Sequence, residues 1–174
     1  MQYTASYQSP LGPITLAADG QALTGVWFDG QKYDKSGLDR ECQEKNLPVF
    51  HQTKRWLDIY FSGQAPDFTP PIRFTGTDFQ KEVWAILAAI PYGETWTYGD
   101  IARQLGLERM SARAVGGAVG HNRLSILVPC HRVVGTGGRL TGYAGGIDRK
   151  IALLKLEGGW KETFVGPGWQ SRAE

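Results

Sequence analysis

The sequence predicts an α+β protein of two unlike domains, a small sheet-plus-helix domain at residues 1–75 and a mainly helical domain at residues 76–174. Short β-rich runs between Gly and Pro turns lie in the first half, and apolar residues at helical spacing dominate the second. A Pro-rich stretch at residues 65–72 predicts a linker between them. A chain of 174 residues is long enough for two small domains with buried cores.

The first domain is predicted to contain a hairpin and a helix. Residues 14–18 and 23–28 are apolar runs of strand length, and the Asp-Gly-Gln sequence between them is a hairpin signal. The polar residues 29–46 predict a loop or a loosely held helix. Residues 48–61 place apolar side chains at helical spacing, and the Ser-Gly pair that follows ends the helix.

The second domain opens with a capped helix. Thr77 and Gln80 are spaced for a capping box, and apolar positions recur at helical spacing until Pro91 ends the run. Two short helices are predicted next, at residues 98–105 and 111–119, joined through a glycine-containing turn. This is the helix-turn-helix pattern, which by itself is weak evidence for DNA binding because ordinary helical hairpins look similar.

The second of these short helices carries almost no side-chain bulk. Glycine inside a helix costs about 1 kcal/mol relative to alanine, so the adjacent Gly116 and Gly117 need a reason. Tight packing against another helix is one interpretation. The other is close approach of a nucleic-acid backbone, with the long side chain of Arg113 reaching into the duplex.

The last predicted helix covers residues 147–157 and ends at a Gly-Gly C-cap. Its apolar stripe predicts a buried face, while Asp148, Arg149 and Lys150 are expected on the solvent side. Glu157 lies at the edge of the stripe. A glutamate there either reaches water or, if it is buried, needs a partner such as a histidine.

Composition and charge narrow the setting. Two cysteines are too few for a disulfide framework and predict reduced thiols. The formal net charge of +2 is too small to predict a nucleic-acid partner by itself. The sequence contains no signal-peptide pattern and no apolar run near the ~20 residues that span a bilayer. We therefore expect a cytoplasmic protein that does not enter a membrane.

The most reactive feature is the pentapeptide Pro-Cys-His-Arg-Val at residues 129–133. Cys130 follows a short apolar run and has His131 directly behind it, and a nearby base can make a thiolate available at neutral pH. A Gly-rich segment at residues 135–146 could fold over such a site. Cysteine and histidine alone fit a thiol hydrolase equally well, so these two residues leave the electrophile open.

Five motifs, taken in order and without large gaps, resemble the O6-alkylguanine-DNA alkyltransferases. They lie at residues 77–84, 90–95, 112–118, 129–134 and 140–146, and residues 9–16 are similar to the family's N-terminal domain. The resemblance implies a ribonuclease-H-like first domain and a winged-helix-like helix-turn-helix in the second. It also implies direct-reversal DNA repair: single-turnover, irreversible transfer of an alkyl group from guanine O6 to Cys130, with no cofactor and no metal.

The same resemblance implies roles for individual residues. Cys130 is the acceptor, His131 the base acting through a bridging water, and Glu157 the group that orients the imidazole. Asn122 braces the turn and the active-site segment. Tyr98 protonates or hydrogen-bonds guanine N3 as negative charge leaves the base.

The resemblance further implies a DNA-contacting face and a pocket. Arg113 would fill the gap left by a flipped nucleotide, with its helix in the minor groove. The implied DNA contacts are Ser111, Ala112, Arg113, Gly116, Gly117 and Arg123, and the implied guanine and alkyl pocket is lined by Val119, Val133, Tyr143 and Ala144. Arg123 departs from the family pattern, since many relatives have proline there; the change either loosens the turn or adds a phosphate contact. Ala144 stands where some members carry serine.

The implied partner is duplex DNA that contains O6-alkylguanine, with O4-alkylthymine as a possible second substrate and a monomer as the expected state. Cooperative binding on DNA and the role of the first domain stay open. Cys42 and His51 are too few for the zinc site that some members carry. Two alternatives remain. A non-catalytic module for alkyl lesions loses support because Cys130 is present, and a thiol hydrolase leaves Arg113 and its small-residue helix unexplained.

Overall fold

The computed structural model describes residues 1–106 and 112–167 and divides into two compact units. The N-terminal unit comprises Met1–Gly76 together with Arg123–Leu127, and the C-terminal unit comprises Thr77–Asn122 and the chain from Val128 onward. The main division falls next to the predicted linker. The return of five residues to the N-terminal unit has no counterpart in the sequence prediction. In the described part of the chain, no helix has the length and apolar character to cross a membrane.

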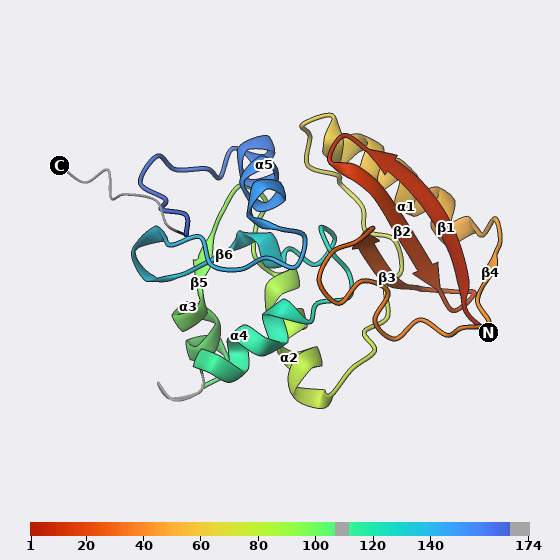
Figure 1. Ribbon diagram of the computed structural model, residues 1–174, viewed down its shortest axis with the longest axis horizontal. Coiled ribbons are helices and arrows are strands. Elements are labelled where there is room, and N and C mark those ends of the chain that lie inside the picture. Colours follow the sequence, from red (N-terminus) through yellow and green to blue (C-terminus); the bar gives the residue numbers. More distant parts are fainter. Residues whose placement is uncertain (107–111, 168–174) are drawn as a thin grey trace. The chain divides into compact units, whose positions relative to one another are not determined.

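The N-terminal unit is a four-stranded sheet with a helix packed against it (Figure 1). Strands β1 (Tyr3–Ser9), β2 (Gly12–Ala18) and β3 (Leu23–Phe28) form an antiparallel meander. The two-residue β4 (Gln43–Glu44) pairs parallel with β1, which gives the order β3-β2-β1-β4. Helix α1 (Pro48–Phe61) begins at a proline, a residue that suits the first turn because its missing N–H would have no helical partner there.

The predicted hairpin and helix of this unit are confirmed, and β1 is a strand that the sequence analysis missed. Residues 14–18 and 23–28 lie in β2 and β3, and both strands are largely buried. The residues of β1 are half-buried or exposed, so they form no apolar run by which to recognise the strand. Residues 29–46 contain turns and β4 and no helix, because their polar side chains have no apolar face to bury.

Within the described residues, the C-terminal unit contains four α-helices and a short parallel pair of strands. The helices are α2 (Asp78–Ala88), α3 (Tyr98–Gln104), α4 (Ala112–Gly120) and α5 (Ile147–Glu157), and the strands are β5 (Trp96–Thr97) and β6 (Val133–Val134). Helices α2, α3 and α4 cluster together in Figure 1. Trp84, which is fully buried on α2, donates from Nε1 to the Ala118 carbonyl on α4 at 2.8 Å and so fixes these two helices to each other.

Local signals place the ends of these helices. Thr77 caps α2 through the predicted box, with Gln80 N–H donating to Oγ1 at 3.1 Å and Gln80 Oε1 accepting from Thr77 N–H at 3.0 Å. Thr97 and Asp100 form a second box at α3. Ser111, the predicted first residue of the next helix, lies outside the described residues.

Helix α5 has the predicted bounds and ends at Gly158, whose φ of 77° is the left-handed conformation that favours glycine. The expectation that Lys150 faces solvent is wrong, because this side chain is 1% exposed. Lys150 lies three residues after Ile147 and four before Leu154, so it is on the same face of the helix as the apolar stripe. Lys150 points inward, and its Nζ donates to the Val133 carbonyl of β6 at 2.6 Å.

Candidate active site

Cys130 begins a single 3₁₀ turn, Cys130–Arg132, directly before β6. The cysteine is 6% exposed, so its thiol is almost entirely shielded from water. Asn122 Nδ2 donates to the Val128 carbonyl at 2.7 Å. The end of α4 is therefore tied to the residue two positions before the nucleophile.

Burial raises the pKa of the Cys130 thiol, while a hydrogen bond from the Asn122 side chain and the charge of Lys150 act in the opposite direction. The resting thiol is thus protonated at neutral pH and needs a base to react. Lys150 is a functional candidate that sequence reasoning missed. Burial lowers its pKa to about 8, which leaves it mostly charged at pH 7.

His131 and Glu157 form a buried pair. His131 Nε2 donates to Glu157 Oε2 at 2.6 Å, and Arg132 Nε donates to Glu157 Oε1 at 2.7 Å. Burial raises the pKa of Glu157, but the hydrogen bonds from His131 and Arg132, together with the charge of Arg132, outweigh this effect and lower the value to about 2. Glu157 is therefore a carboxylate throughout the physiological range, and it has the histidine partner that its burial requires.

The protonation state of His131 follows from its surroundings. Burial lowers the pKa of His131 against the opposing effect of the Glu157 carboxylate, so the imidazole is neutral at pH 7. In a neutral ring with Nε2–H directed at a carboxylate, Nδ1 carries the free lone pair. Nδ1 is buried and has no hydrogen-bond partner among the described residues. This nitrogen is equipped to act as a base.

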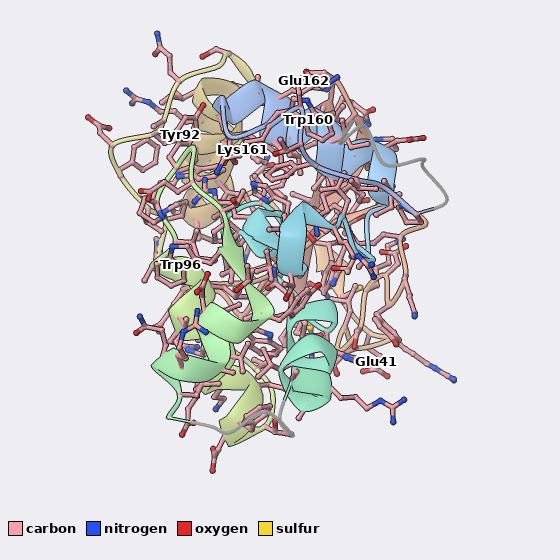
Figure 2. All side chains as sticks on the ribbon, turned by 90° about the vertical axis from the view of Figure 1, so that its left-hand side faces the viewer. Glu41, Tyr92, Trp96, Trp160, Lys161 and Glu162 are labelled. Atoms are coloured by element: carbon pink, nitrogen blue, oxygen red, sulfur yellow. The ribbon has the colours of Figure 1, made fainter. Side chains whose placement is uncertain are left out.

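Arg132 and the turn at Tyr92–Gly93 complete the surroundings of the carboxylate. Arg132 Nη1 donates to the Ile90 carbonyl at 2.7 Å, and its guanidinium lies 5.6 Å from the centre of the Tyr92 ring (labelled in Figure 2). Gly93 has a φ of 81°, the left-handed conformation that favours glycine, and a Cβ there would also lie 3.2 Å from the Glu157 carbonyl oxygen. The arginine next to the cysteine–histidine pair was a usable signal for this contact.

The predicted pocket residues lie on several elements. The Tyr98 hydroxyl, at the start of α3, is 2.7 Å from Thr141 Oγ1, and burial raises its pKa. Tyr143 packs edge-to-face with His131, with ring centres 6.4 Å apart. The other pocket positions are Val119 and Val133, which are buried, and Ala144, which is half-buried. Among the residues that the structure describes, no three side chains of metal-binding type are grouped as ligands.

The surface of α4 bears on why this helix has so many small residues, for which the sequence left tight packing against another helix or close approach of DNA. Arg113, Ala112 and Gly117 are exposed. A Cβ on Gly117 would meet no described atom within 4 Å, and one on Gly116 would meet Tyr98 Cε1 at an ordinary 3.9 Å. Tight packing against the described part of the chain therefore does not explain Gly117. Arg123, the remaining predicted DNA contact, belongs to the N-terminal unit, and Ser111 is outside the described residues.

The fold and site define a class: a sheet unit joined to a helix-turn-helix unit that also carries a buried cysteine with a histidine–carboxylate pair. Residues 78–159 match the family model "6-O-methylguanine DNA methyltransferase, DNA binding domain". Residues 2–74 match the model "6-O-methylguanine DNA methyltransferase, ribonuclease-like domain". The chain belongs to the 6-O-methylguanine DNA methyltransferase family.

Individual relatives agree with this assignment. The methylated-DNA–protein-cysteine methyltransferase of Mycobacterium tuberculosis is 46% identical over 157 residues, which cover 90% of this chain and 93% of the relative. The protein of the same name from Methanosarcina acetivorans is 47% identical over 156 residues, or 90% of this chain and 98% of the relative. The crystal structure of M. tuberculosis OGT in complex with DNA superposes with a TM-score of 0.81 at 44% identity, covering 90% of this chain and 92% of that one.

Proposed function

We propose that this protein repairs O6-alkylguanine in duplex DNA by accepting the alkyl group on Cys130, once and irreversibly. The observation that carries the proposal is the buried Cys130 beside the His131–Glu157 pair, in the unit that matches the family's DNA-binding domain. A bond forms between Sγ and the alkyl carbon while the bond from that carbon to O6 breaks. The electron pair stays on guanine, which gains the proton lost by the thiol, so the products are a thioether and unmodified guanine.

The surrounding groups supply the proton transfers. His131 Nδ1 accepts the thiol proton through a bridging water, and Glu157 holds the opposite side of the ring and stabilises the imidazolium. Asn122 and Lys150 stabilise the thiolate as it forms, in keeping with their effect on its pKa. The Tyr98 hydroxyl hydrogen-bonds guanine N3 and offsets the charge that develops on the leaving base.

Helix α4 provides the contact with DNA. Its exposed small residues let the helix approach the minor groove, and Arg113 fills the space of a nucleotide that turns out of the duplex. The flipped guanine then lies among Val119, Val133, Tyr143 and Ala144. Both cysteines are free thiols, which fits a reducing cytoplasmic location.

Intact-protein mass after incubation with a duplex that contains O6-methylguanine tests the acceptor. We expect a gain of one methyl group on the wild type and on Cys42→Ala, a control that removes the half-buried cysteine of the other unit. Cys130→Ala should gain nothing. Repaired DNA together with an unmodified wild-type protein would contradict the proposal.

Arg113→Ala tests the contact with DNA. The variant should react more slowly with the duplex lesion but at the wild-type rate with free O6-benzylguanine, because the free base needs no flipping. Arg55→Ala, an exposed arginine of α1, is the matched control and should leave both rates unchanged. Equal losses on both substrates for Arg113→Ala would argue against the proposed role.

A further inference from the structure

The segment that leads to the nucleophile is divided between the two units. Asn122 and Val128 belong to the C-terminal unit, but Arg123–Leu127, the five residues between them, belong to the N-terminal unit. We infer that Arg123 and Thr75 are positioning residues for Cys130, because their side chains fix the segment of chain that leads to it. This inference rests on the proposed role of Cys130.

Backbone hydrogen bonds join the segment to strand β3. Val26 N–H donates to the Arg123 carbonyl at 2.8 Å, and Ser125 N–H donates to the Val26 carbonyl at 3.0 Å. Leu124 thereby forms a parallel bridge with Val26. Residues 123–125 are therefore hydrogen-bonded to strand β3 of the N-terminal sheet.

Side chains fix the segment at two further points. Arg123 Nη1 donates to Thr75 Oγ1 at 2.9 Å, and the guanidinium passes so close to Gly37 that a Cβ there would lie 2.7 Å from Nη1. Ser125 Oγ donates to Gln31 Oε1 at 3.4 Å, and both residues are buried. The Arg123 guanidinium thus has a partner within the protein, which favours a positioning role over the phosphate contact expected from the sequence.

A strained turn explains why this segment needs to be held. Ile126 is 1% exposed and has a φ of 74°, which is a left-handed conformation that a β-branched residue rarely adopts. Such strain persists only where the surrounding structure over-determines the backbone. The contacts of Arg123 and Ser125 fix the chain before the turn, and Asn122 fixes Val128 after it. The approach to Cys130 is held from both sides.

The test measures alkylation of Cys130 by free O6-benzylguanine and by an O6-methylguanine duplex. Arg123→Ala and Thr75→Val should lower both rates by the same factor, roughly tenfold, since misplacement of a reacting group slows every substrate. Thr75→Ser keeps the hydroxyl and should restore the wild-type rate. The double variant should be no slower than Arg123→Ala alone, because both changes remove one interaction. The matched control is Arg73→Ala, whose guanidinium pairs with Asp19 instead.

Three results would overturn the inference. A loss for Arg123→Ala on the duplex alone, with a changed salt dependence, would make this residue a phosphate contact. A wild-type rate for Thr75→Val would show that the hydrogen bond between Arg123 and Thr75 does not position the segment. If the rate of a variant falls only by the fraction of protein that a melting curve shows to be unfolded, the contact serves stability and not positioning. Failure of the wild type to react with either substrate would instead refute the proposed function.

Discussion

Replacing Glu157 with glutamine tests the electrostatic design of the site. The variant keeps the side-chain shape but removes the carboxylate that His131 and Arg132 share at 2.6 and 2.7 Å. Arg132 is only 8% exposed, so its charge would be left without a counter-ion. Breaking a buried ion pair in this way costs about 3–5 kcal/mol, so we expect the free energy of unfolding at pH 7 to fall by about this amount.

The pH dependence of the free energy of unfolding provides a second test of the contact between His131 and Glu157. A pKa that falls from 4.5 to about 2 in the folded protein corresponds to about 3 kcal/mol of stability. Because the folded value is the lower one, this contribution is complete above pH 4.5 and is lost as the pH falls from there to about 2. Glu157→Gln has no such contribution, so its deficit relative to the wild type should shrink in acid.

Urea unfolding followed by circular dichroism, at pH 7 and at pH 3, measures both effects. Glu162→Gln is the matched control, since Glu162 is exposed and accepts a surface hydrogen bond from Trp160 Nε1 at 3.2 Å (Figure 2). We expect the control to match the wild type at both pH values. A Glu157→Gln protein of wild-type stability at pH 7, or one with the same deficit at pH 3, would refute the reasoning.

Three further substitutions test other parts of the account. Lys150→Met should slow the reaction of Cys130 with iodoacetamide at pH 7 and move its pH profile toward alkali, because the ammonium that lowers the thiol pKa is gone. Tyr98→Phe should slow repair of the duplex lesion by roughly 100-fold, the lower end of the usual range for general acid catalysis, as measured by rapid-quench kinetics. Trp84→Phe should lower the free energy of unfolding by about 1 kcal/mol in urea titrations, because the Ala118 carbonyl loses the indole hydrogen bond and keeps only the longer one from His121 N–H at 3.3 Å.

The sequence predicted the regular elements well where local chemistry decides them. The capping box at Thr77 and the left-handed glycine at Gly158 are short-range devices, and they set the ends of α2 and α5 as expected. The sequence analysis missed strand β1 because this strand is formed by its pairing with β2 and contains no apolar run that would reveal it. The prediction for Lys150 was wrong because a lysine usually faces solvent, although the helical position of this one is on the side of the apolar stripe.

The site shows the same division between local and long-range information. The cysteine–histidine pair is visible in one pentapeptide, and the position of Glu157 at the edge of an apolar stripe left two outcomes, contact with water or a buried pair with a histidine; the structure shows the second. Arg132 is in that same pentapeptide, yet its contact with Glu157 depends on α5, 25 residues further along the chain. The contact of Arg123 with Thr75 spans 48 residues, and no local pattern encodes it.

The number of guanines repaired per protein molecule tests the central claim most directly. A known amount of protein is incubated with an excess of O6-methylguanine duplex, and the unmodified guanine formed is quantified over time. The account predicts one repaired guanine per active molecule and no further reaction, because the thioether on Cys130 cannot be removed. Continued turnover after the first equivalent would contradict it and would favour a hydrolase.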